Sequence, residues 1–108
     1  MNLTPHVLNV IRQDGSVMNL VPSGTVARVQ EVRGEVAMTV DGVEIRRPST
    51  WGQVVGLPDS QDGQHIFIVS AMVSEALGGS RGDVVRPGEL VRSPDGQPIG
   101  CRGLIWAA

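Results

Sequence analysis

Short apolar runs, each closed by a turn signal, recur along the whole chain. Val, Ile and Leu dominate these runs, and Gly, Pro and Asp-Gly pairs separate them. Runs of about four to eight such residues are typical of β-strands. We therefore expect strands over residues 7–11, 17–21, 25–32, 36–40, 43–46, 66–69, 89–92 and 98–105, with 51–58 as a further candidate.

Three Asp-Gly pairs mark hairpins between neighbouring runs. Gly accepts the positive φ that a tight hairpin turn requires, and Asp tolerates it better than most residues. The pairs begin at Asp14, Asp41 and Asp95, and each lies between two apolar runs. We expect an antiparallel hairpin at each of them.

The stretch 64–79 (QHIFIVSAMVSEALGG) is the place where a strand pattern leads directly into a helical one. The run 66–69 is entirely apolar, and Ser70 can accept hydrogen bonds from the first amides of a helix. Residues 71–77 favour a helix, and Gly78 with Gly79 would end it. The sequence predicts one short helix near residues 70–77.

The number and length of these elements predict the architecture. A chain of 108 residues is typical of one domain with one core, and we expect a single domain over 1–108. The fold class that we expect is mainly β (α+β). It would be a small antiparallel barrel or sandwich of about seven to nine short strands with that one helix.

Arg28 lies inside a run whose buried face the pattern does not identify. In the run 25–32, Arg28 shares one face with Val26, and Ala27 shares the other with Val29. Either face could be the buried one. Arg28 therefore points toward a pocket or interface, where it needs a partner, or it faces water from an edge strand.

The charge composition excludes some classes of partner. The net charge is −2, so the chain does not bind nucleic acid or an acidic membrane surface through bulk charge. All nine basic residues are Arg. The exclusive use of Arg has two alternative explanations. One is coding bias in a GC-rich genome, and the other is that guanidinium groups suit phosphate and carboxylate ligands. We expect no nucleic-acid partner.

Cys101 is the single cysteine, so no intrachain disulfide can form. This favours a reducing compartment, and we expect the cytoplasm. No apolar run approaches a membrane span of about 20 residues, and the N-terminus does not resemble a signal peptide. We expect no membrane association.

No catalytic or metal-binding constellation is visible in the sequence. His6 and His65 are far apart, and neither has a Cys or carboxylate at ligand spacing. A zinc site needs about four ligands, and Cys101 is the only thiol. Cys101 and a histidine could meet in space as nucleophile and base, but a buried structural cysteine is the simpler interpretation. We expect no enzyme activity, no metal and no cofactor.

The junction at Ser70 is the best candidate for a binding site. A helix N-terminus presents free amides and a partial positive charge, which suit phosphate. Arginines on the following loop and strand edge could add bidentate contacts. The alternative is an ordinary N-cap with solvated arginines. The candidate ligand-binding residues are Arg28, Ser70, Arg81, Arg86 and Arg92.

The apolar end of the chain, GLIWAA at 103–108, predicts a homo-oligomer. This segment carries no charged side chain, and an apolar strand left in water is a liability. We expect it to pack into an interface between copies of the chain.

Five motifs resemble those of a group of small proteins from bacteria and their phages. The motifs are LTPHVLNV (3–10), PSGTVARV (22–29), GLP (56–58), IFIVSAMVSEA (66–76) and RGDVVRPG (81–88), and together they span nearly the whole chain. Phe67 stands where the pattern of the group has Tyr, so a role for that hydroxyl is not carried over.

The resemblance implies a protein that acts by binding. Some small phage proteins of this class sequester nucleotide signals made by host defence systems, such as cyclic dinucleotides or cyclic ADP-ribose. It implies a non-enzymatic, homo-oligomeric binder of a phosphorylated small molecule, in the host cytoplasm if a phage encodes it. Two alternatives stay open: a structural or protein-interaction module of a phage or bacterium, and a small nucleotide hydrolase.

Overall fold

The computed structural model describes residues 1–59 and 65–107, and within these ranges the chain is mainly β. It forms nine strands and one helix there: β1 (Leu8–Ile11), β2 (Val17–Leu20), β3 (Arg28–Val32), β4 (Val36–Val40), β5 (Val43–Arg46), β6 (Thr50–Val55), β7 (Phe67–Ile68), α1 (Ala71–Leu77), β8 (Val84–Arg92) and β9 (Pro98–Trp106). The predicted fold class, mainly β with one short helix, is confirmed.

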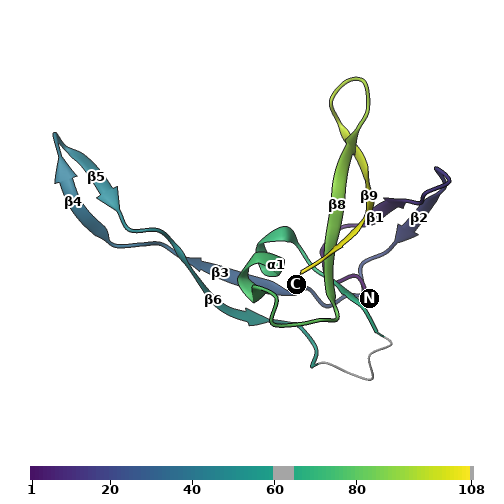
Figure 1. The fold of residues 1–108 in the computed structure, drawn as a ribbon, viewed down its shortest axis with the longest axis horizontal. Coiled ribbons are helices and arrows are strands. Elements are labelled where there is room, and N and C mark those ends of the chain that lie inside the picture. The colour runs from purple at the N-terminus through teal and green to yellow at the C-terminus, as the bar shows by residue number, and fades with distance from the viewer. Residues whose placement is uncertain (60–64, 108) are drawn as a thin grey trace.

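Three sheets hold these strands (Figure 1). The largest has the order β2-β1-β9-β8-β7, while β3 with β6 and β4 with β5 form two-stranded sheets. The described strands do not close into a barrel. The pairs β1–β2, β4–β5 and β8–β9 are antiparallel, as their Asp-Gly turns predict.

Two pairings in the large sheet are parallel, which the antiparallel prediction did not include. β7 pairs with β8 through Phe67 and Ile68, and β1 pairs with β9 through Val10 and Ile11. Parallel neighbours need a crossover connection, and α1 supplies it between β7 and β8.

β8 is longer than the sequence indicates. The sequence predicts a strand only over 89–92, and Pro87 and Gly88 just before it are residues that usually interrupt a strand. Yet β8 runs unbroken from Val84 to Arg92 and pairs with β9 along most of that length. Gly88 permits this pairing, since a Cβ there would collide with the carbonyl oxygen of Arg102. Long-range pairing here overrides local composition.

β3 resolves the ambiguous run 25–32. Ala27 is buried and Val29 packs against the core, whereas Arg28 lies on the exposed face. β3 begins only at Arg28. The backbone before it is bonded elsewhere, because the Ala27 amide donates to the carbonyl of Leu3 at 2.9 Å.

The hydrophobic core is small and lies where α1 meets β3, β6 and β8. Phe67 is its largest side chain and is 1% exposed. Burying one such side chain contributes about 1.5–3 kcal/mol, so a few residues supply most of the hydrophobic stabilisation. The buried cluster consists of Leu3, Ala27, Phe67, Val69, Val73 and Val84.

A buried hydrogen-bond network holds the amino-terminal segment beside this core. The Asn2 side-chain amide donates to the carbonyls of His6 (2.9 Å) and Leu20 (3.0 Å). Its oxygen accepts from the Thr4 amide (3.0 Å) and the Thr4 hydroxyl (2.7 Å). The network gives residues of the LTPH motif a structural role.

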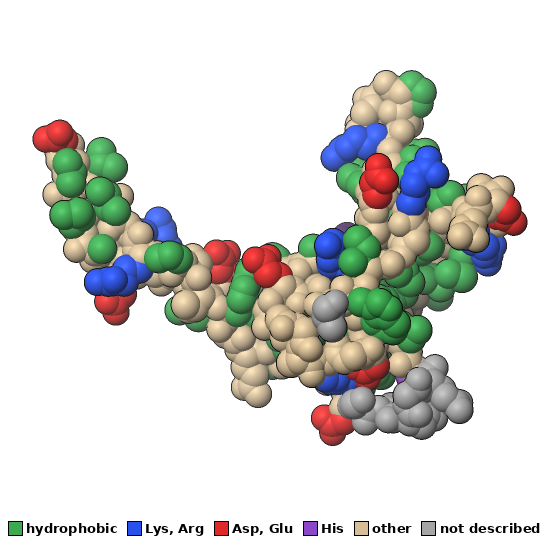
Figure 2. Space-filling model, viewed as in Figure 1, with side chains coloured by type: hydrophobic (Ala, Val, Ile, Leu, Met, Phe, Trp, Pro, Cys, Tyr) green, Lys and Arg blue, Asp and Glu red, His purple; other side chains and the backbone are tan. Residues whose placement is uncertain are grey.

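One part of the chain projects far from the core. β3 and β6 lead away from α1 and carry the β4–β5 hairpin at their far end (Figure 1). We call this hairpin, β4 and β5 with their turn, the arm. The radius of gyration is 17.1 Å, against about 13 Å for a compact domain of this length. Apolar side chains gather on the arm (Figure 2).

Candidate functional site

A pocket beside the start of α1 brings together Arg28 and Ser70, two of the five predicted site residues. Its volume is about 270 Å³. Arg28 is the only charged side chain among the described residues that line it, which makes the pocket electropositive. The lining consists of Leu3, Thr4, Pro5, Val26, Ala27, Arg28, Val29, Ser70, Met72 and Val73.

Arg28 and Ser70 each owe their position to the buried residue one place earlier in the chain. Ala27 precedes Arg28, and Val69 precedes Ser70; Ala27 and Val69 both belong to the core cluster. Neighbouring residues of extended backbone point in opposite directions, so Arg28 and Ser70 turn outward. Packing of the core therefore places the two polar groups at the same pocket.

The N-cap predicted at Ser70 is confirmed. The Ser70 backbone is extended, and its hydroxyl accepts a hydrogen bond from the Val73 amide at 3.3 Å. At the other end, Gly78 closes α1 in the left-handed conformation (φ 58°), which Gly adopts without a steric penalty. The sequence therefore identified both ends of the helix.

Two kinds of donor at this pocket have no acceptor within the described part of the chain. They are the guanidinium of Arg28 and the first-turn backbone amide of Met72. α1 has only seven residues, so its dipole alone does not make an anion site. The charge that attracts an anion comes from Arg28.

Arg81 does not join this pocket, because the protein itself occupies its guanidinium. Its Nε and one Nη donate to the two carboxylate oxygens of Asp83, each at 2.9 Å, and the same Nη donates to the carbonyl of Pro58 at 2.9 Å. The hydrogen bond to Asp83 is the main cause that raises the pKa of Arg81. The bond to Pro58 links the loop before β8 to the segment after β6.

Arg86 and Arg92 also lie apart from the Arg28–Ser70 pocket. Both are on β8, six residues and therefore about 20 Å apart. Arg86 lines a separate pocket of about 370 Å³ with Glu75 and Trp106. Arg92 donates to the carbonyl of Gly96 at 2.9 Å and so closes the β8–β9 turn. The five predicted residues thus do not form one site.

Sequence reasoning missed the contribution of the amino-terminal segment to the pocket. Leu3, Thr4 and Pro5 line it, although they are more than 60 residues from Ser70 in the sequence. The motif LTPH is the signal that could have indicated this segment. The residues of the motif do not by themselves indicate that this segment packs beside α1, because that contact depends on residues far away in the sequence.

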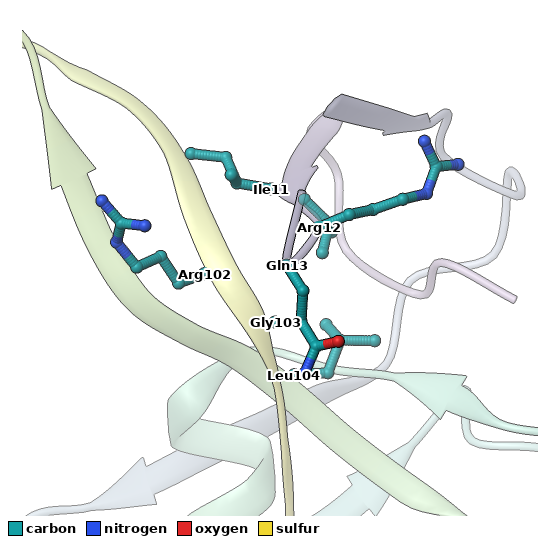
Figure 3. Close-up of a pocket in the computed structure, with 7 residues that line it drawn as sticks. Ile11, Arg12, Gln13, Arg102, Gly103 and Leu104 are labelled. Carbon is teal, nitrogen blue, oxygen red and sulfur yellow. The ribbon is translucent and has the colours of Figure 1, made fainter. Parts of the chain in front are cut away.

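A further hollow opens where β1 parts from β9 beyond Ile11 (Figure 3). Its volume is about 520 Å³, and Arg12 and Arg102 are among its lining residues. The two guanidinium groups point away from each other (Figure 3), and that of Arg12 donates to the Ser16 hydroxyl at 3.3 Å. Arg12 and Arg102 therefore do not form a joint anion-binding site.

His6 and Cys101 line one pocket, of about 720 Å³, whose other lining residues are mostly apolar. Cys101 is buried, as the structural interpretation of this cysteine expects. No three His, Cys, Asp or Glu side chains within residues 1–59 and 65–107 come together in a way that could hold a metal ion.

The comparisons with known proteins found no counterpart. No protein-family model, no curated protein and no solved structure matches the chain.

Helix length bears on membrane insertion. In the part of the chain that the structure describes, no helix is long and apolar enough to cross a membrane.

Proposed function

We propose that this chain is a non-enzymatic binding protein for a phosphorylated small molecule, held in the Arg28–Ser70 pocket. The observation that carries the proposal is the unpaired guanidinium of Arg28, at a pocket that also contains the Ser70 hydroxyl and no carboxylate among its described lining residues. Guanidinium binds phosphate through two parallel hydrogen bonds, each about twice as strong as a bond between neutral groups. The pocket therefore favours an anion.

The size of the pocket indicates how much of a ligand it holds. Its volume of about 270 Å³ is just below the range of about 300–1,000 Å³ that is typical of small-molecule sites. Leu3, Pro5 and Met72 supply apolar walls beside the polar groups. This space suits a phosphate with its attached sugar, and the rest of a larger ligand would extend across the surface.

The motif resemblance supports a nucleotide as this ligand. The role that we propose is sequestration of a nucleotide immune signal of the cyclic dinucleotide or cyclic ADP-ribose type. We propose that it acts in the cytoplasm. The described lining contains no Asp, Glu or His that could act as a general acid or base. This chemistry supports binding without turnover.

A titration tests the proposal directly. Thermal unfolding is followed with cyclic dinucleotides, cyclic ADP-ribose, ADP-ribose and inorganic phosphate as probes. A ligand at 100 times its Kd raises the free energy of unfolding by about 2.7 kcal/mol, so a bound nucleotide should raise the Tm clearly. No shift with any nucleotide would overturn the proposal. Chromatography should return the bound nucleotide unchanged, and a product peak would instead favour the hydrolase alternative.

Two arginine variants locate the site. Arg28→Ala removes a charged hydrogen-bond donor worth about 1.5–3 kcal/mol, so nucleotide affinity should fall about ten- to hundredfold. Arg92→Ala makes the same change in charge at the β8–β9 turn, far from the pocket, and should leave affinity unchanged. Equal losses in the two variants would show that bulk charge, not this pocket, attracts the ligand.

Ser70 permits a matched pair of variants, because Asp and Asn both replace Ser well as an N-cap. Ser70→Asn should keep the helix and retain binding within a few-fold. Ser70→Asp should keep the helix equally well but place a negative charge beside the phosphate, and should abolish binding. If both variants bind as the wild type does, the ligand does not lie at the start of α1.

A second candidate, a structural or protein-interaction module, is favoured by one separate observation. The apolar side chains of the arm lie uncovered in the protomer. Large assemblies that form without any ligand, measured by native mass spectrometry, would favour this candidate over a ligand binder.

A further inference from the structure

The arm has one apolar face, which no described residue of the protomer covers. In the β4–β5 register Met38 lies opposite Ile45, and Val40 lies opposite Val43. Residues opposite each other in an antiparallel pair share a face, so these four side chains form one surface, which we call the arm face. Thr39 and Glu44 form the other face. All four apolar side chains are exposed.

A strand with this alternation is normally half-buried. Apolar residues on one face and polar residues on the other are the pattern of a sheet that packs on a core. A two-stranded hairpin is marginally stable at best when it stands alone in water. The arm therefore has the sequence of a packed element, but it has no packing partner within the part of the chain that the structure describes.

A second uncovered apolar surface lies on the large sheet. The pocket of about 720 Å³ crosses β1, β9 and β8. We call it the sheet groove. Leu90 and Ile99 line it and are 51% and 50% exposed. Its apolar lining also includes Val7, Leu8, Pro87 and Pro98. It is concave and apolar, whereas the arm is a projecting apolar hairpin.

The arm does not cover the groove of its own chain. In Figure 1 the arm and the β8–β9 hairpin project in different directions from the core, and β4 and β5 pack mainly on each other. A second copy of the chain, by contrast, carries both an arm and a groove of the same kind, so one partner is sufficient to cover both surfaces.

The exposed area of the protomer is large enough to supply a dimer interface. The chain exposes 7425 Å², whereas a compact monomer of its mass exposes about 5,800 Å². The excess is about 1,600 Å² for each copy, which is about 3,200 Å² for two copies, within the range of roughly 2,000–5,000 Å² that obligate homodimers bury.

We propose that the arm face of one copy packs into the sheet groove of a second copy. In a twofold dimer both arms are exchanged, and each copy buries both of its uncovered apolar surfaces. This proposal does not depend on the ligand or on the Arg28–Ser70 pocket, so either one can fail without the other.

Sedimentation of the full chain and of two matched arm variants tests the proposal. The wild type should sediment as an oligomer. Met38→Glu places a charge on the arm face and should raise the Kd of self-association at least about tenfold. Thr39→Glu adds the same charge on the opposite face of the same strand and should leave self-association unchanged. A monomeric wild type, or equal effects of the two variants, would overturn the proposal.

Mixing variants tests the groove as the acceptor. Leu90→Glu, in the groove, should be as monomeric as Met38→Glu. An equimolar mixture of the two should form heterodimers, because the intact arm of the Leu90→Glu chain fits the intact groove of the Met38→Glu chain. Arm-on-arm packing predicts no such rescue, so a mixture that stays monomeric would overturn the proposal. Met38 and Leu90 are exposed, and circular dichroism should show both variants folded.

Discussion

Met38 and Ile45 lie directly opposite each other in the β4–β5 hairpin, and they are 57% and 45% exposed. A cross-strand pair of this kind contributes only about 0.2–1 kcal/mol. Their contact alone therefore does not hold the arm in shape. We therefore expect the order of the arm to depend on whether a second copy covers its apolar face.

Hydrogen exchange should show this dependence as an effect of protein concentration. Amides of the arm should exchange slowly where copies associate and quickly after dilution, because an isolated hairpin is marginally stable. Amides of the β8–β9 hairpin, which belongs to the large sheet, serve as the internal control and should not respond to dilution. The measurement is exchange followed by mass spectrometry at two concentrations. Arm protection that is independent of concentration would contradict the prediction.

Arg81→Lys should destabilise the fold without affecting ligand binding. Lys cannot reproduce the guanidinium fork that binds both oxygens of Asp83 and the carbonyl of Pro58. The pair is largely shielded, with side-chain exposures of 20% and 12%. We expect a loss of about 1–3 kcal/mol in urea unfolding.

Arg92→Lys is the matched control for this change. Arg92 makes one exposed hydrogen bond, to the carbonyl of Gly96, so its replacement should change stability by less than about 0.5 kcal/mol. If Arg81→Lys instead keeps full stability and weakens nucleotide binding, Arg81 acts on the ligand rather than on the fold.

Gly88→Ala and Gly82→Ala should change stability in opposite directions. A Cβ at position 88 would collide with the carbonyl oxygen of Arg102 in β9, whereas no atom of residues 1–59 and 65–107 lies within 4 Å of a Cβ at position 82. The first variant should lose about 2 kcal/mol or more through the forced backbone shift. The second should gain about 0.4–1 kcal/mol, because Ala restricts the unfolded chain. The Tm of each variant, measured by thermal unfolding, tests both predictions. A Gly88→Ala protein as stable as the wild type would show that β8 and β9 do not pair as closely at this position.

Asp14 and Asp95 should titrate at lower pH than ordinary aspartates. The Ser16 hydroxyl, followed by the Ser16 amide, lowers the pKa of Asp14. The Ser93 hydroxyl, followed by the Gln97 amide, lowers the pKa of Asp95. A folded-state pKa below the unfolded value adds stability above the unfolded pKa. That stability is lost as the pH falls through the folded pKa, so both turns should loosen in acid.

The measurement is a carboxyl titration by NMR. The variant Ser16→Ala should bring the pKa of Asp14 back toward its ordinary value and leave Asp95 unchanged. Ordinary titration of both carboxyls in the wild-type protein would contradict the assigned hydrogen bonds.

The elements of this protein follow from local features of the sequence. The Asp-Gly pairs at Asp14, Asp41 and Asp95 located three hairpins because a positive φ is a property of the residue itself. Ser70 and the glycine at 78 located the ends of α1 because capping groups act within one turn. Short runs of Val, Ile and Leu between turn residues located most strands for the same reason.

The tertiary structure alone decided which arginines are available to a ligand. Besides its local pair with Asp83, Arg81 donates to the carbonyl of Pro58, 23 residues away. Arg28 lines the same pocket as Ser70 only because the amino-terminal segment, β3 and α1 share one core. The uncovered arm is a result of the same kind, since its sequence pattern is that of a packed strand. A pattern shows that a face is apolar, but hydrogen-bond partners and covering surfaces come from residues distant in the chain, and folding alone brings them together.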